Sequence, residues 1–112
     1  MNIGIDIEEV GRFENMLKLK PKLIKKIFFE NELDYSQKKR NQAQTLCGIW
    51  CAKEAIIKAI SEFELIDVRD INICHEKNGA PFVEPIKNLK LSISISHTKH
   101  YATAVAIASK IE

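Results

Sequence analysis

Two carboxylates in this sequence lie among apolar residues. Segment 3–7 reads as a strand whose isoleucines share one face, and Asp6 lies on the other face. Glu54 lies within a long apolar segment. A buried carboxylate is costly unless it is paired or binds a metal ion. Mg²⁺ is commonly held by one or two carboxylates, so the two acids together predict a Mg²⁺ site. Lys58, one helical turn after Glu54, would then meet a phosphate as a point charge.

Each of these residues also has a purely structural interpretation. Glu54 can form an i,i+4 ion pair with Lys58. Asp6 can cap the helix that follows it, although either of the next two glutamates lies closer to the helix start. His97 ends a strand in which serines alternate with apolar residues, and a histidine at such a place is more often structural than functional.

Hydrophobic periodicity predicts the elements that position these residues. Segment 1–7 alternates with period two and predicts a strand, and segment 8–20 predicts a helix that Pro21 ends. A short amphipathic piece is expected at 23–29, and a polar, turn-rich section extends from there to residue 39. Segment 41–61 is apolar on nearly all sides, which indicates the main, buried helix.

The second half of the chain is rich in strand signals. We expect strands at 70–74, 91–96 and 101–108, a turn at 78–81, and a hairpin connection at 97–100. Four alanines share one face of the last strand, which allows the main helix to approach closely. The predicted fold class is α+β, a small antiparallel sheet packed against one long buried helix, in a single domain over 1–112.

Composition narrows the function classes. Of 112 residues, 46% are hydrophobic and 29% charged, as in a soluble globular domain, and the longest uncharged stretch, 41–52, is too short to span a membrane. Three cysteines cannot all pair with one another, so we expect a reduced, cytoplasmic setting. The four glycines form neither a GxGxxG motif nor a P-loop. Any phosphate must therefore be held by metal, lysine and histidine.

Positive charge is concentrated in the first half of the chain. Residues 1–60 have a balance of +3 and residues 61–112 a balance of −1. The clustered basic residues are Lys18, Lys20, Lys22, Lys25, Lys26, Lys38, Lys39 and Arg40. Such runs form either a solvated face or a surface that attracts an acidic partner, phosphate-bearing or protein.

Three stretches, in order along the chain, carry a resemblance to a known family. They are Gly4 to Phe13 (GIDIEEVGRF), Gly48 to Ala59 (GIWCAKEAIIKA), and Ser92 to His97 (SISISH) continuing through Tyr101-Ala102. Residues 28–35 and 78–81 are weaker matches. Together they resemble the signature blocks of the holo-[acyl-carrier-protein] synthases, the short-chain 4′-phosphopantetheinyl transferases.

This resemblance implies a fold and an activity. The fold would be that of the 4′-phosphopantetheinyl transferases. The enzyme would use Mg²⁺ to move 4′-phosphopantetheine from coenzyme A to a serine of apo-acyl carrier protein, releasing 3′,5′-ADP, in fatty-acid biosynthesis. The serine would attack the β-phosphate, and its proton would pass to Glu54 or to a water on the metal. A homotrimer with active sites between neighbouring subunits is also implied.

The resemblance assigns roles at matching positions. The metal ligands would be Asp6 and Glu54, and the catalytic residues Glu54 and Lys58. The residues that contact coenzyme A would be Lys58, His97, Gly79 and Pro81. The residues that bind the acyl carrier protein would be Arg12 and Met16, on the first helix.

Two departures from the family pattern concern coenzyme A. Ile49 stands where the family usually has an arginine, and residues 60–63 replace a glycine-rich turn. The candidates to supply the missing positive charge are Lys39, Arg40 and Lys53. We expect activity to be retained and the affinity for coenzyme A to be the property most affected.

Two other functions remain open at this point. An acidic residue on a strand followed by a Glu/Lys helix is also compatible with a Mg²⁺-dependent nuclease, although few aromatic residues are available to stack bases. A non-catalytic carrier-binding module would follow if Ile49 and the altered turn prevented coenzyme A binding. The preferred function involves neither nucleic acid nor membrane.

Overall fold

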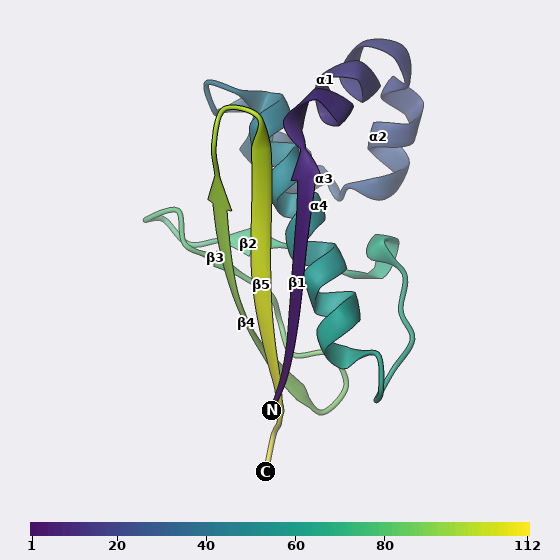
Figure 1. Ribbon diagram of the computed structural model, residues 1–112, viewed down its shortest axis with the longest axis vertical. Coiled ribbons are helices and arrows are strands. Elements are labelled where there is room, and N and C mark those ends of the chain that lie inside the picture. Colours follow the sequence, from purple (N-terminus) through teal and green to yellow (C-terminus); the bar gives the residue numbers. More distant parts are fainter.

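The computed structural model describes all residues from Met1 to Glu112. Its elements are β1 (Asn2–Glu9), α1 (Val10–Leu19), α2 (Pro21–Ile27), α3 (Glu30–Gln37), α4 (Gln42–Ile60), a 3₁₀ turn η1 (Val68–Asp70), β2 (Cys74–His75), β3 (Pro81–Phe82), β4 (Leu89–His97) and β5 (Tyr101–Lys110). The main antiparallel sheet has the order β1-β5-β4, and α4 lies across one face of it (Figure 1). The predicted fold class is therefore confirmed.

Small residues let α4 lie directly on the sheet. The inner face of β5 carries only the four alanines at 102, 104, 106 and 108, each at most 2% exposed. On β1 the inner position next to α4 is Gly4, where a Cβ atom would lie 1.9 Å from the carbonyl oxygen of Ala55. The helix and two strands thus approach backbone to backbone, as the all-alanine face predicts.

Two segments differ from the sequence prediction. Residues 30–37, expected to be turn-rich, form α3, because Glu32 at its third position accepts a hydrogen bond from the Phe29 N–H and is anchored in the core. The strand expected at 70–74 is reduced to Cys74–His75. Before it, in the turn η1, the Asp67 carboxylate accepts a hydrogen bond from the Arg69 N–H, and the Asp70 carboxylate accepts one from the Asp67 N–H. These bonds take the chain out of an extended path.

Helix boundaries follow local chemistry. Pro21 follows α1 and occupies the first position of α2, where its missing N–H costs nothing. Asn41 caps α4, because its side-chain oxygen accepts a hydrogen bond from the Gln44 N–H at 3.0 Å. None of the helices combines the length and the apolar composition that crossing a bilayer requires.

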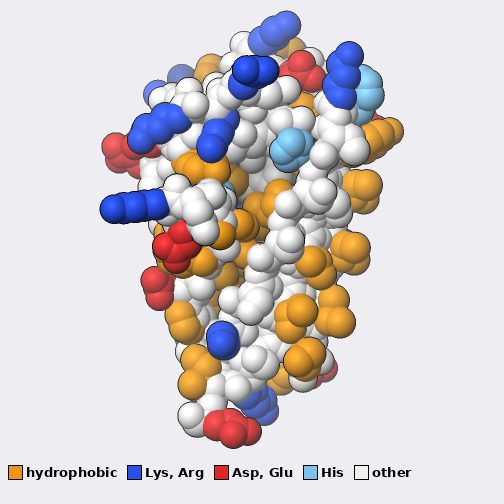
Figure 2. Space-filling model, turned by 90° about the vertical axis from the view of Figure 1, so that its left-hand side faces the viewer, with side chains coloured by type: hydrophobic (Ala, Val, Ile, Leu, Met, Phe, Trp, Pro, Cys, Tyr) orange, Lys and Arg blue, Asp and Glu red, His pale blue; other side chains and the backbone are white.

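The outer face of the sheet is uncovered, and on β1 and β5 it is mostly apolar. Ile3, Ile5 and Ile7 of β1 are 62–66% exposed, and Tyr101 and Ile107 of β5 continue the same face. Figure 2 shows a row of hydrophobic side chains along the right-hand edge, where the sheet is seen from the side. A contiguous exposed apolar surface of this kind is typical of an interaction site.

Candidate active site

Asp6, Glu54 and Lys58 lie near one another where β1 lies on α4. Asp6 is on the inner face of β1, and Glu54 is half-buried on the facing side of α4. The Lys58 ammonium lies 3.3 Å from the Asp6 carboxylate and donates a hydrogen bond to the Ile5 carbonyl at 2.9 Å. Lys58 therefore pairs with Asp6, not with Glu54. Asp6 is not a helix cap, because the N-cap position of α1 is Glu9.

The two carboxylates repel each other. Burial raises the pKa of Glu54, the negative charge of Asp6 raises it further, and Lys58 and Arg12 only partly offset this. The cluster thus offers hard oxygen donors with too little positive charge around them. It fits a Mg²⁺ ion that takes two protein carboxylates and completes its shell with water and phosphate oxygens. No group of three or more His, Cys, Asp or Glu side chains is placed to hold a metal ion.

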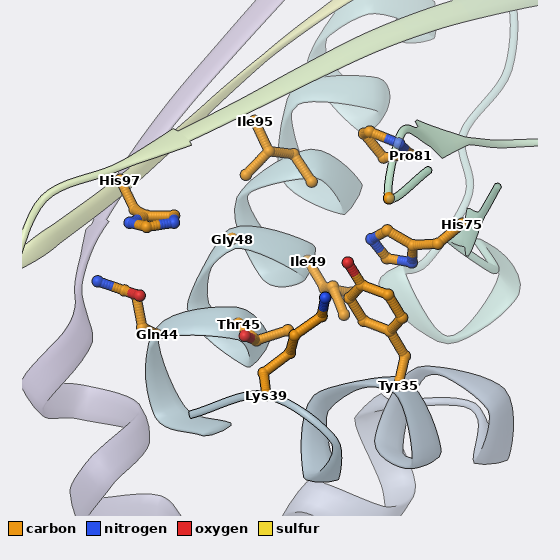
Figure 3. Close-up of a pocket in the computed structure, with 11 residues that line it drawn as sticks. Tyr35, Lys39, Gln44, Thr45, Gly48, Ile49, His75, Pro81, Ile95 and His97 are labelled. Carbon is orange, nitrogen blue, oxygen red and sulfur yellow. The ribbon is translucent and has the colours of Figure 1, made fainter. Parts of the chain in front are cut away.

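A pocket of about 250 Å³ lies between α4 and the β4 side of the sheet (Figure 3). His97 reaches it from the end of β4, and Gly79 and Pro81 from the β2–β3 turn. Three of the four residues predicted to contact coenzyme A therefore line one cavity. Gly79 has φ +92°, the left-handed conformation that glycine adopts most easily, so the turn predicted at 78–81 is present.

One wall of this pocket could not be predicted from the sequence. The rings of Tyr35 and His75 stack with their centroids 3.6 Å apart, and the Lys39 ammonium lies 4.7 Å from the centre of the Tyr35 ring. Burial, and then the positive charge of Lys39, lower the pKa of His75, so the imidazole is neutral near pH 7. Tyr35 and His75 are 40 positions apart and belong to no common motif.

Of the three residues proposed to replace the arginine missing at position 49, only Lys39 lines the pocket, beside Ile49 itself. Lys53 was a wrong candidate, because its ammonium is fully buried and paired with Glu32. Arg40 is exposed and is not among the residues that line the cavity. Lys39 thus provides the permanent positive charge of this pocket.

Arg12 and Met16 lie together on α1. They line a shallow groove with Leu19, Lys20 and Leu23 at the junction of α1 and α2. The Arg12 guanidinium forms an ion pair with Glu8 at 2.6 Å and lies 5.1 Å from the centre of the Trp50 ring. This groove combines apolar side chains with positive charge, which suits an acidic partner that also buries an apolar residue.

A single chain does not bring all the predicted site residues together. Asp6 lies on β1 and His97 on β4, and these strands flank β5 on opposite sides. The main helix α4 lies between the two groups, since Gly48 faces Ile95 of β4 while Ala55 faces Gly4 of β1. The acidic cluster and the pocket are therefore two separate halves of the predicted site within one chain.

Comparison with known proteins identifies the family and the fold of this chain. The family model of the 4′-phosphopantetheinyl transferase superfamily matches residues 2–108. The holo-[acyl-carrier-protein] synthase of Caldicellulosiruptor bescii is 40% identical over 121 residues, which cover 97% of this chain and 98% of that protein. The structure of the Helicobacter pylori enzyme of that name in complex with coenzyme A has a TM-score of 0.82 at 29% identity, over 96% of this chain and 99% of that one. The Bacillus anthracis enzyme in complex with CoA (3′,5′-ADP) has a TM-score of 0.78 at 30% identity, over 99% and 96%.

The fold and the family match define the class of enzyme: the chain belongs to the 4′-phosphopantetheinyl transferase superfamily. Within it, the chain is similar over almost its whole length to the holo-[acyl-carrier-protein] synthases. The resemblance carried by the three sequence stretches is thereby confirmed, and so is the prediction of an enzyme of this class.

Proposed function

We propose that this protein transfers 4′-phosphopantetheine from coenzyme A to a serine of apo-acyl carrier protein, with Mg²⁺ as cofactor and 3′,5′-ADP as the leaving product. The observation that carries the proposal is the repelling pair Asp6 and Glu54 with Lys58 beside it, in a chain of this superfamily. From the family resemblance we place the activity in the cytoplasm and in fatty-acid biosynthesis. That membership favours transfer over the nuclease alternative.

Asp6, Glu54 and Lys58 would each have a different role in the transfer reaction. A new bond forms between the carrier serine oxygen and the β-phosphorus of coenzyme A, and the bond to the bridging oxygen breaks, so that 3′,5′-ADP leaves with the electron pair. Asp6 and Glu54 would hold Mg²⁺, which when bound offsets negative charge on the pyrophosphate. Lys58 would turn from Asp6 to the same phosphates. Glu54 is our candidate acceptor for the serine proton.

We further propose a homotrimer in which the pocket of one subunit faces the acidic cluster of its neighbour. The separation of the two halves within one chain supports this arrangement, because neither half alone can position both ends of coenzyme A. The uncovered apolar face of β1 and β5 supports it as well, since it provides a surface for association.

The test is direct. Purified protein is incubated with coenzyme A, Mg²⁺ and an apo-acyl carrier protein, and the mass of the carrier is followed. We expect the carrier to gain the mass of one phosphopantetheine group, with release of 3′,5′-ADP, and the gain to stop when Mg²⁺ is chelated. Calorimetry that detects carrier binding without coenzyme A binding would instead indicate the non-catalytic module.

Disruption of the apolar face should separate the subunits. Ile5→Lys places a charge at an outer position of β1 that is 62% exposed. We expect sedimentation velocity to change from the mass of three chains to that of one, and transfer to fall together with it. Leu65→Lys, at an apolar position 88% exposed outside the sheet, is the control and should leave the trimer intact. A wild-type protein that sediments as a monomer yet is fully active would disprove the shared site.

Reversal of charge on α1 should weaken the carrier complex. Arg12→Glu removes a cation from the groove and adds a like charge toward an acidic carrier, so we expect the KM for the carrier to rise about tenfold, which corresponds to ~1.4 kcal/mol. The KM for coenzyme A should change little. Lys87→Glu, on an exposed loop away from the groove, is the control. Equal losses in both variants would show a general charge effect and not a docking surface.

Removal of the pocket cation should weaken coenzyme A binding. Lys39→Met retains the aliphatic part of the side chain but removes the charge, so we expect the Kd for coenzyme A to rise about tenfold. Lys38→Met, at the exposed neighbouring position, is the control. Calorimetry measures both, and an unchanged Kd in Lys39→Met would show that Lys39 does not compensate for Ile49.

A further inference from the structure

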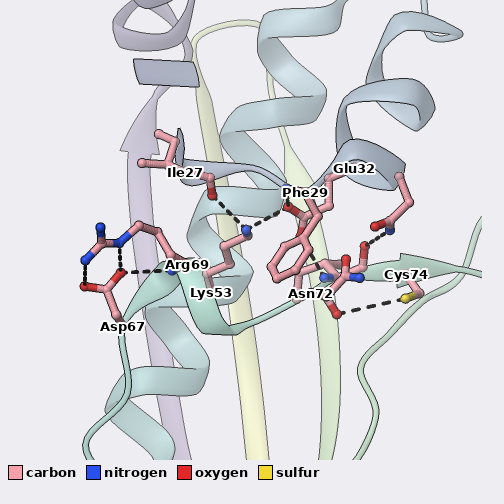
Figure 4. A network of polar contacts seen from close by, with 10 residues as sticks. Ile27, Phe29, Glu32, Lys53, Asp67, Arg69, Asn72 and Cys74 are labelled. Carbon is pink, nitrogen blue, oxygen red and sulfur yellow. Dashed lines mark hydrogen bonds and ion pairs between the residues drawn. The ribbon is translucent and has the colours of Figure 1, made fainter. Parts of the chain in front are cut away.

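Two opposite charges are buried in the protein and take no part in the proposed chemistry. Lys53 of α4 and Glu32 of α3 have fully buried side chains, and Nζ lies 2.7 Å from Oε1 (Figure 4). Removal of two ions from water costs more than their attraction returns unless further hydrogen bonds satisfy both groups. A pair in this position therefore needs specific partners.

The partners of the pair come from separate segments. The Glu32 carboxylate accepts hydrogen bonds from the backbone N–H of Phe29 and from that of Ile73, each at 2.7 Å. The Lys53 ammonium also donates to the carbonyl of Ile27 at 2.9 Å. One ion pair thus joins the end of α2, the start of α3, the segment before β2, and the middle of α4.

The joined segments carry the walls of the pocket. Tyr35 follows Glu32 by one turn of α3, and His75 follows Ile73 by two residues, and these two side chains form the stacked wall. The floor is provided by Ile49, one turn before Lys53 on α4. The Glu32 carboxylate therefore fixes the two halves of the wall relative to each other, and Lys53 fixes that wall relative to the floor.

We infer that Glu32 and Lys53 are positioning residues that hold the Tyr35–His75 wall against α4, and so determine the affinity for coenzyme A without contacting it. The inference rests on the proposed function for the identity of the ligand. The carrier groove at Arg12 and Met16 receives none of the hydrogen bonds of this pair. Within that groove only Leu23 lies on a helix that the pair joins, one turn before Ile27 of α2. Glu32→Gln does not remove the bond from Lys53 to Ile27, so its effect should fall mainly on coenzyme A.

Kinetics separates positioning from general stability. The Glu32 carboxylate accepts three hydrogen bonds, from Lys53 and from the N–H groups of Phe29 and Ile73. In Glu32→Gln the amide has only one acceptor oxygen, so it accepts fewer of them, and it leaves the Lys53 charge uncompensated. We expect the KM for coenzyme A to rise at least tenfold, while kcat and the KM for the carrier stay within about threefold of wild type. A residue that acts only through stability would lower the active fraction, and thus kcat, and would leave both KM values unchanged.

A second variant covers the case in which the first does not fold. Glu32→Gln combined with Lys53→Met removes both charges, which a core tolerates better than one unpaired charge. We expect the double variant to fold and still to show the raised KM for coenzyme A, because the bonds that span the segments are lost. Ile60→Ala, a buried position at the far end of α4, is the control for lost stability. The same rise in KM in that control would overturn the inference.

A measurement without ligand tests the pair independently of the proposed function. The stacked Tyr35 ring shifts the NMR signals of the His75 ring protons upfield, and Tyr35→Ala gives the unstacked reference. We expect those signals in the folded pair variants to move toward that reference. Unchanged signals would overturn the inference. If wild type shows the stacked signals but binds no coenzyme A, the proposed function fails and the positioning role of the pair is still decided.

Discussion

Asp6→Ala and Glu54→Ala are each expected to reduce phosphopantetheine transfer by about 10²- to 10³-fold or more, because each removes a carboxylate that would hold the cation against the developing phosphate charge. The two side chains lie together where β1 meets α4, and the raised pKa of Glu54 reflects, after burial, the charge of Asp6. Loss of either should also weaken Mg²⁺ binding. Carrier mass measured against time gives the rate, and calorimetry gives the affinity for Mg²⁺.

The fold should survive these changes. A carboxyl group whose pKa is raised by folding costs stability once the pH is above that pKa, since the charged form is the one disfavoured in the native state. Glu54→Gln should therefore melt at or above the wild-type temperature at pH 7 while transfer is lost. Glu9→Ala, on the exposed face of the same strand as Asp6, is the control and should remain active. Mg²⁺-dependent transfer retained in Asp6→Ala or Glu54→Ala would exclude the metal site.

Gly4→Ala is expected to destabilise the protein by more than about 3 kcal/mol, because the added methyl group has no room. Its Cβ atom would lie 1.9 Å from the Ala55 carbonyl oxygen and 2.7 Å from the Ala59 nitrogen. Both are backbone atoms of the buried helix α4, so no side chain can rotate away. The helix would have to move off β1, and the contact that brings Glu54 to Asp6 would be lost with it.

Chemical denaturation measures this effect. Gly11→Ala is a matched control at an exposed position of helix α1, where the nearest atom to an added Cβ is a flexible Glu14 side-chain oxygen at 4.0 Å. That change should be neutral or stabilising by up to about 1 kcal/mol, since alanine favours helix. A Gly4→Ala protein as stable as wild type would mean that β1 and α4 are not in close contact.

The hydrophobic patterns of the sequence correctly predicted which faces of the main strands and of the main helix are buried. The alternation at 1–7, the apolar segment 41–61 and the all-alanine face of the last strand each specify which side chains are buried, and the structure confirms all three. The same patterns placed Asp6 and Glu54 on the inner faces of their elements. Their roles as metal ligands stay predictions.

Long-range pairing accounts for what the patterns missed. Helix α3 is polar by composition, and its Glu32 is buried only because Lys53 arrives from a helix 21 positions later. Helical spacing pairs Lys58 with Glu54, whereas the structure pairs it with Asp6 from a strand 52 positions away. The division of the site between the two edges of the sheet also depends on strand order, which motif order along the chain does not reveal.

Crystals grown with coenzyme A and Mn²⁺ in place of Mg²⁺ provide the decisive measurement, because the anomalous signal locates the metal without any assumption about its ligands. We expect one peak per subunit within bonding distance of the Asp6 and Glu54 carboxylates, in contact with the pyrophosphate of a coenzyme A whose other end lies in the pocket of Tyr35, His75 and His97 of a neighbouring subunit. A peak away from both carboxylates, or a pyrophosphate that contacts neither the metal nor Lys58, would contradict the proposed transfer site.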